Sequence, residues 1–217
     1  MKNKTKTILG AVLCAILQFN VANTEAGGVT KYNSLSECAL QAVHQQEDID
    51  KLSVLADNAK GSIDKMYLHW SAMNYENAYD DYHINIGRFG EIRITCNELT
   101  EKKAHTWRRN SRAIGISMDC MLDAAYREGK TYWGPCPPTN AQIRTMALVI
   151  AVVAEHLEID INKDTVMTHA EAAIIDNYGL GSGDPEVRWD MLYLIDPDTC
   201  KEVPGGELLR DMSRRIK

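Results

Sequence analysis

The sequence predicts an α/β protein in which helices flank a central mixed β-sheet, with a helical extension before it. Two observations lead to this fold class. Short apolar segments typical of β-strands recur between residues 66 and 168, and a long amphipathic helix pattern lies among them at residues 140–157. Strands that alternate with helices in this way indicate a layered α/β domain.

Residues 1–26 predict a secretory signal peptide rather than part of the fold. Three early lysines precede an almost wholly apolar run from Ile8 to Leu17, and small residues follow around Ala22 and Ala26. The apolar run is shorter than the ~20 residues that a membrane-spanning helix needs. We therefore expect an exported protein, periplasmic or secreted, that is not embedded in the membrane once the signal is removed.

Residues 27–62 are expected to form the helical extension, and residues 63–217 the main domain. Within the extension, apolar residues recur at helical spacing from Ser34 to about Lys60, and a serine at position 34 or 36 is a candidate N-cap. The main domain is long enough to bury a sizeable core.

The first strands of the sheet are predicted between residues 66 and 118. Met66–His69 is a short apolar strand. Residues 82–94 alternate on either side of a turn at Gly87–Gly90, which is typical of a β-hairpin. Ala113–Met118 is a further apolar strand.

The clearest helix is predicted at Asn140–Leu157. A pair of prolines ends the preceding segment, and Thr139 with Gln142 forms a T-x-x-Q capping box. Apolar residues then recur at the i, i+3, i+4, i+7 spacing of one buried face. A short strand near residues 165–168 follows and leads to His169.

Charge and cysteine content limit the expected partners and cross-links. The formal charge is −6 and there is no basic run, which argues against a nucleic-acid partner. The cysteines after the signal segment form no C-x-x-C pair, so a structural zinc knuckle is not expected. In an oxidising compartment they can form one or two disulfides, in an order that the spacing does not select. These cysteines are Cys38, Cys96, Cys120, Cys136 and Cys200.

Two histidines and one aspartate lie in three separate segments that we expect to meet. His69 ends one apolar strand, His169 follows another, and Asp184 lies in a glycine-rich loop before a proline. Two imidazoles and a carboxylate are a common ligand set for catalytic zinc, which keeps its fourth position open for water. If the three side chains converge, the protein is a metal-dependent hydrolase.

Six short motifs occur in order between about Lys65 and Leu194. They are His69-Trp70, Tyr82-His-Ile-x-Ile86 with Phe89-Gly90, His105-x-x-x-x-Asn110, Ala113-Ile-Gly-Ile116, the helix that contains Gln142, and His169-x-Glu171 followed by Gly183-Asp-Pro185 and Trp189-Asp190. Together they resemble the type 2 N-acetylmuramoyl-L-alanine amidases, a family similar to phage lysozyme-type amidases and to peptidoglycan recognition proteins.

The resemblance implies zinc-dependent hydrolysis of the amide between N-acetylmuramic acid and L-alanine, with peptidoglycan or muropeptides as substrate. It implies that His69, His169 and Asp184 bind the zinc and that Tyr82 assists catalysis. His105 and Asn110 match positions that contact the substrate in relatives.

The chain departs from the family pattern at two positions. Ser182 stands where relatives often have lysine, and Ser117 stands where many bacterial members have glutamate, with Asp119 two residues later. The general base is therefore open, and Glu171 is a candidate either for that role or for orienting the site.

Two other functions stay open from the sequence. One is a binding module of the same fold that recognises peptidoglycan without cutting it. The other is a zinc peptidase that cuts within the stem peptide. If the protein is a secreted effector against competing bacteria, an inhibitor or immunity protein is a further expected partner.

Overall fold

The computed structural model describes residues 35–184 and 188–216, with side-chain surroundings from residue 43 onward. The predicted signal segment lies outside the described residues. The chain divides into two compact units, Met1–Asp50 and Lys51–Lys217. Helix α2 (Leu35–Ala59) passes through the boundary between them and has almost the predicted bounds. The second unit contains the sheet and the candidate site.

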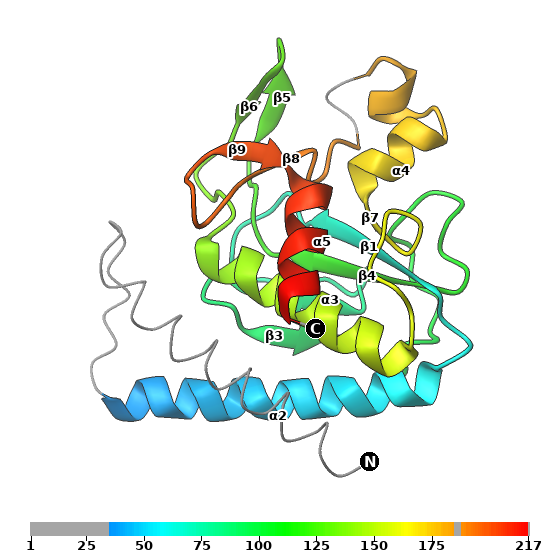
Figure 1. Ribbon diagram of the computed structural model, residues 1–217. Coiled ribbons are helices and arrows are strands. Elements are labelled where there is room, and N and C mark those ends of the chain that lie inside the picture. The colour runs from blue at the N-terminus through cyan, green and yellow to red at the C-terminus, as the bar shows by residue number, and fades with distance from the viewer. Residues whose placement is uncertain (1–34, 185–187, 217) are drawn as a thin grey trace. The chain divides into compact units, whose positions relative to one another are not determined.

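A five-stranded mixed sheet forms the centre of the second unit (Figure 1). The strand order is β3-β2-β4-β1-β7, in which β3 is antiparallel to β2 and the other neighbours are parallel. The carboxyl ends of four strands therefore meet at one edge. The strands are β1 (Lys65–Trp70), β2 (Ile84–Ile86), β3 (Ile92–Ile94), β4 (Ala113–Met118) and β7 (Val166–Thr168). The α/β class with a central mixed sheet is thus confirmed.

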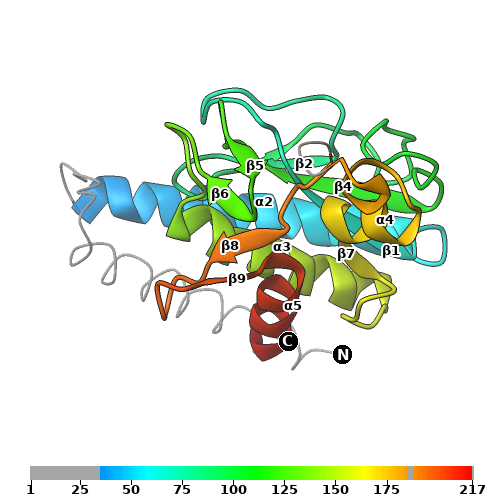
Figure 2. The same ribbon diagram turned by 90° about the horizontal axis from the view of Figure 1, so that it is seen from above.

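Helix α3 (Asn140–Leu157) has the predicted bounds and the predicted capping box. The Thr139 hydroxyl accepts from the Gln142 N–H at 3.1 Å, and the Gln142 side chain accepts from the Thr139 N–H at 3.0 Å. The helix packs against β2 and β4, and α5 (Gly205–Ile216) packs against α3 and β7. Figure 2 shows α5 lying against α3.

Several short elements of the second unit were not predicted. They are helix α4 (His169–Ile175), helix α5, the hairpin formed by β5 (Ala125–Arg127) and β6 (Lys130–Tyr132), and the hairpin formed by β8 (Tyr193–Ile195) and β9 (Glu202–Pro204). The two hairpins lie close together in both views (Figures 1 and 2). No helix in the described part of the chain combines the length and apolarity that crossing a bilayer requires.

Strand β4 is buried along its whole length, and close packing requires a glycine at position 115. A Cβ added at Gly115 would lie 2.6 Å from Cγ of His105. Only glycine leaves room for this ring against the strand. The Ile-Gly-Ile motif therefore places the loop that carries His105 directly on the sheet.

Candidate metal centre

His69 and His169 meet at the carboxyl edge of the sheet. His69 lies near the end of β1, paired in register with Ser117 of β4. His169 is the first residue of α4 (His169–Ile175), directly after β7. Because β1 and β7 are parallel neighbours, their ends bring the two imidazole rings together, with centroids 4.7 Å apart. Both side chains are buried.

Asp190 completes the group through one carboxylate oxygen. Its Oδ2 lies 3.3 Å from Nδ1 of His69 and 3.2 Å from Nδ1 of His169. One ligand atom from each of these three residues lies within 4.8 Å of the other two. The Asp190 carbonyl accepts from the Ala170 N–H at 3.2 Å, so the backbone itself ties this residue to the start of α4.

The predicted third ligand, Asp184, is not part of this group. It is exposed and follows a 3-10 turn (Gly179–Ser182) that extends the loop after α4. Its N–H donates to the carbonyl of Gly179 at 3.0 Å. Asp190, and not Asp184, therefore lies beside the two histidines in the structure. The physical reason is that the 3-10 turn carries Asp184 to the surface.

Burial and mutual charge give His69 and Asp190 the protonation states that metal ligands need. Burial lowers the pKa of His69 to about 4, although its hydrogen bond to Asp190 acts in the opposite direction. Burial alone would raise the pKa of Asp190, but the charges and hydrogen bonds of His169 and His69 hold that pKa well below its usual range. At neutral pH His69 is neutral and Asp190 is ionised, as coordination requires.

Thr106 holds the far side of the His69 ring. Its Oγ1 lies 3.2 Å from Nε2 of His69 and 3.0 Å from Nδ1 of His105. A hydrogen bond to the second ring nitrogen of a metal-binding histidine fixes its tautomer and its orientation. Nothing in the sequence singled out Thr106, because a threonine in a loop carries no pattern of its own.

His105 and Asn110, the predicted substrate contacts, surround this threonine. His105 is buried, with 5% of its surface exposed, and its ring centroid is 5.5 Å from that of His69. The Asn110 side chain accepts from the Thr106 N–H at 2.8 Å. Both residues therefore shape the loop that supports His69, and their contact with substrate stays a prediction.

Tyr82 lies beside the metal-ligand group, as predicted for a catalytic tyrosine. Its ring centroid is 5.1 Å from that of His69, and it precedes β2 in a turn rather than forming part of the strand. Burial, followed by the nearby carboxylates of Asp190 and Asp81, raises the pKa of its phenol. The hydroxyl therefore stays protonated and can act as a hydrogen-bond donor.

Glu171, the candidate general base, is hydrogen-bonded to residues outside the metal-ligand group. Its carboxylate accepts two hydrogen bonds from Arg210, both at 2.8 Å, and one from the Thr168 N–H at 3.0 Å. Burial alone would raise its pKa, but these partners lower it. A carboxylate held by an arginine and by a helix N-terminus is a weak base, so these contacts assign Glu171 to capping α4 and to joining it to α5. The motif Thr168-x-x-Glu171 is the sequence signal for that role.

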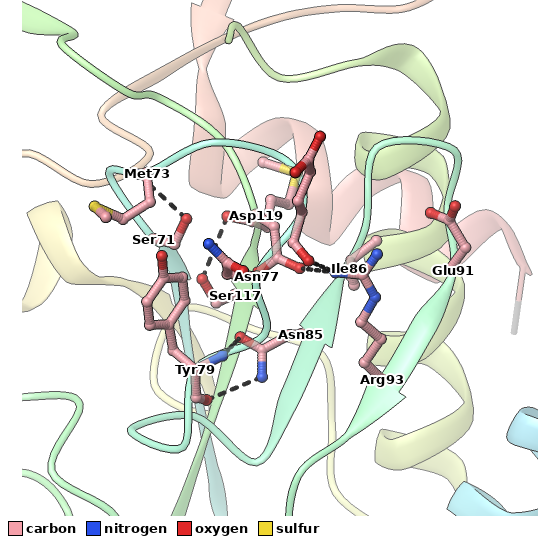
Figure 3. A network of polar contacts seen from close by, with 12 residues as sticks. Ser71, Met73, Asn77, Tyr79, Asn85, Ile86, Glu91, Arg93, Ser117 and Asp119 are labelled. Atoms are coloured by element: carbon pink, nitrogen blue, oxygen red, sulfur yellow. Dashed lines mark hydrogen bonds and ion pairs between the residues drawn. The ribbon is translucent and has the colours of Figure 1, made fainter.

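A second polar network lies at the ends of β2 and β4 (Figure 3). Buried Asp119 accepts from Arg93 at 3.0 Å, and Asn85 bonds to the backbone of Tyr79 in both directions at 3.1 Å. Burial raises the pKa of Asp119 to about 7. The positive charge of Arg93 lowers this pKa, and the negative charge of Glu91 raises it further. This network supports the sheet edge that carries Ser117.

The residues at the edge fit a zinc ion. Two imidazole nitrogens and one carboxylate oxygen converge, His69 has a hydrogen-bonded outer partner, and only three protein ligands are present among the described residues. Catalytic zinc sites commonly have this composition.

Comparison with known proteins assigns the chain to a family. The family described as N-acetylmuramoyl-L-alanine amidase matches residues 43–185, which include both histidines and Asp184 and end before Asp190. No curated protein matches the chain significantly. Because the match extends over more than half of the 217 residues, this chain belongs to the N-acetylmuramoyl-L-alanine amidase family, whose members act on peptidoglycan.

Proposed function

We propose that this protein is a zinc-dependent amidase that hydrolyses the bond between N-acetylmuramic acid and L-alanine in peptidoglycan. One observation carries the proposal: Oδ2 of Asp190 lies 3.2 and 3.3 Å from the Nδ1 atoms of two histidines at the carboxyl edge of the sheet. Family membership supports peptidoglycan as the substrate class, and this geometry supports a metal site.

The separations are compatible with zinc ligation as well as with the hydrogen bonds that join the three side chains. Two ligands that each lie about 2.0 Å from a tetrahedral zinc are separated by roughly 3.3 Å. Both Nδ1–Oδ2 separations at Asp190 have this length. A zinc ion held by His69, His169 and Asp190 would activate a water molecule and polarise the scissile carbonyl.

The chain's own residues then orient the ligands and stabilise developing charge. Thr106 keeps the His69 ring in one orientation through its contact with Nε2 at 3.2 Å. The Tyr82 phenol, which burial keeps protonated, donates to the carbonyl oxygen of the scissile amide as negative charge develops there. A preorganised donor of this kind acts most strongly where water is partly excluded.

Export is part of the proposal, because peptidoglycan lies outside the cytoplasmic membrane. The lysine-rich start, the apolar run of Ile8–Leu17 and the small residues after it support this location. An inhibitor or immunity protein is proposed as a partner only if the amidase serves as a secreted effector against competing bacteria.

Digestion of purified peptidoglycan tests the function. Zinc-loaded protein and its His169→Ala variant are compared, and the products are identified by mass spectrometry. We expect free stem peptides that begin with L-alanine, and none from the variant. Cleavage between stem residues would instead show a peptidase, and binding without products by zinc-loaded protein would show a recognition module.

A further inference from the structure

The segment from residue 120 to residue 136 forms a loop whose two ends touch through the backbone. The N–H of Met121 donates to the carbonyl of Cys136 at 2.6 Å. Close by, a Cβ added at Gly134 would lie 2.1 Å from the carbonyl oxygen of Leu122, so these backbones are also in contact. The hairpin β5–β6 projects from this closed base.

We propose that Cys120 and Cys136 form a disulfide that closes the base of this hairpin. In the structure both cysteines are free thiols. The 2.6 Å hydrogen bond from the residue after Cys120 to the carbonyl of Cys136 keeps their Cα atoms within roughly 7 Å of each other. Disulfides span Cα separations of about 4.4–6.8 Å. Among the described cysteines, no other pair has such a backbone bond between their segments.

The other described cysteines have different surroundings. Cys96 is buried and its thiol lies 3.7 Å from the carbonyl of His83. Cys200 is exposed and follows β8, where its N–H donates to the carbonyl of Asp196. The proposal therefore selects one pairing from the many that the cysteine count allows.

The bond would form by thiol–disulfide exchange with a small oxidised disulfide. The Cys136 thiolate attacks one sulfur of the oxidant and releases its partner as a thiol. The Cys120 thiolate then attacks Sγ of Cys136 and releases the second thiol. Two protons leave the protein and two electrons reduce the oxidant disulfide to two thiols.

We expect the exchange to be fastest during folding, before Cys120 becomes buried. Cys120 is fully buried and Cys136 is half-buried. Burial, with the neighbouring Asp119 and Cys136, raises the pKa of the Cys120 thiol well above its ordinary value. Since only the thiolate attacks, exchange is faster before the loop closes over Cys120.

The hairpin that the bond would hold also supports the candidate metal centre. Tyr126 of β5 stacks on Trp189, with ring centroids 6.0 Å apart and planes at 28°. Trp189 in turn packs edge-on against Trp70 at 4.7 Å. Because Asp190 follows Trp189 directly, a rigid hairpin base helps to hold this ligand in place.

Peptide mapping tests the pairing without reference to enzymatic activity. The full chain is refolded in reduced and oxidised glutathione, alkylated without reduction and digested with trypsin. We expect the peptides 113–127 and 131–144, which contain Cys120 and Cys136 respectively, to appear as one linked species. Alkylation of both cysteines, or links from either one to another cysteine, would overturn the proposal.

A stability measurement supplies the second test. We expect the oxidised wild type to melt roughly 5–10 °C above the Cys136→Ser variant, because closing a loop of this length restricts the unfolded chain. A reductant should remove the difference, and Cys200→Ser should melt as the wild type does. Equal melting of the oxidised wild type and Cys136→Ser would contradict the bond.

Discussion

Asp190 meets both histidines through the same carboxylate oxygen, and this sharing distinguishes it from the other acids that the structure describes. Glu171, two residues after His169, is fully engaged by Arg210 and Thr168. Asp184 is exposed. Oδ2 of Asp190 lies 3.2–3.3 Å from the two histidine Nδ1 atoms and is hydrogen-bonded to both. A metal ion bound between these three atoms would take the place of the two hydrogen bonds.

Asparagine substitutions at the two candidate aspartates separate the ligand predicted from sequence from the one in the structure. We expect Asp190→Asn to weaken zinc binding at least about 100-fold, because it removes the anionic ligand. Asp184→Asn, the matched control, should bind zinc as the wild type does. The measurement is competition with a chromophoric chelator, and loss of affinity in Asp184→Asn alone would reverse the assignment.

Tyr82 is predicted to act on the transition state rather than on the metal. Tyr82→Phe should lower kcat about 100-fold, the order expected for the loss of one oxyanion donor, with zinc affinity unchanged. Tyr132→Phe, at an exposed position, is the control. Steady-state kinetics with a soluble muropeptide give the result, and unchanged kcat in Tyr82→Phe would remove the tyrosine from the mechanism.

Helix α4 positions one of the two candidate ligand histidines. It begins at His169, so its N-terminus sets the position of that ring. Thr168 caps this N-terminus, and Glu171 closes the capping box while pairing with Arg210 of α5. The terminal helix is thereby joined to the element that carries a metal ligand.

Glu171→Gln tests whether this residue supports the fold or acts as the base. Loss of one partner of this partly buried ion pair should lower the free energy of unfolding by roughly 2–3 kcal/mol. A general base would instead contribute about 10²–10⁴-fold to the rate. We expect reduced stability in urea and nearly unchanged kcat, with exposed Glu207→Gln as control; the opposite pattern would make Glu171 the base.

Elements with a clear apolar or capping pattern could be predicted from the sequence, and elements without one could not. The capping box and apolar spacing of Asn140–Leu157 and the apolar run of Ala113–Met118 correspond to α3 and β4. Strands β5, β6 and β9 have three residues each with no alternation of apolar side chains, unlike the equally short β2 and β3, whose isoleucines alternate on either side of a glycine turn. Helix α5 begins at two glycines, which normally argue against a helix.

Across the whole molecule, the sheet topology decides which residues converge. This explains which of the candidate metal ligands could be predicted from the sequence. His69 lies near the end of one apolar strand and His169 directly follows another, which the sequence could indicate. That these strands are parallel neighbours, so that the two rings meet, comes from the structure. Asp190 enters from a loop. Two aspartates only six positions apart carry no pattern that shows which one turns inward, and only the path of the backbone distinguishes them.

The stability of the whole fold should carry a pH signature from Asp119. Its pKa is raised from 3.8 to about 7, chiefly by burial. Between these values the folded chain keeps a proton that the unfolded chain has released, so a rise in pH through this window destabilises the fold. Relative to Asp119→Asn, the wild type should lose roughly 2–3 kcal/mol between pH 4.5 and 7.5.

Urea unfolding at several pH values gives this difference directly. Because other acids and histidines titrate equally in both proteins, comparison with Asp119→Asn isolates the one carboxyl. Parallel stability curves for wild type and variant would show that Asp119 ionises normally inside the fold.

Hydrolysis of a muramoyl dipeptide tests the central claim most directly, because this compound offers one lactyl amide to L-alanine and one peptide bond after it. Wild type stripped of metal, the same protein with zinc restored, and His169→Ala with zinc are compared by mass spectrometry. The account predicts N-acetylmuramic acid and a free dipeptide only from the zinc-restored wild type. Equal cleavage without zinc, cleavage at the peptide bond, or no cleavage by protein shown to hold zinc would contradict it.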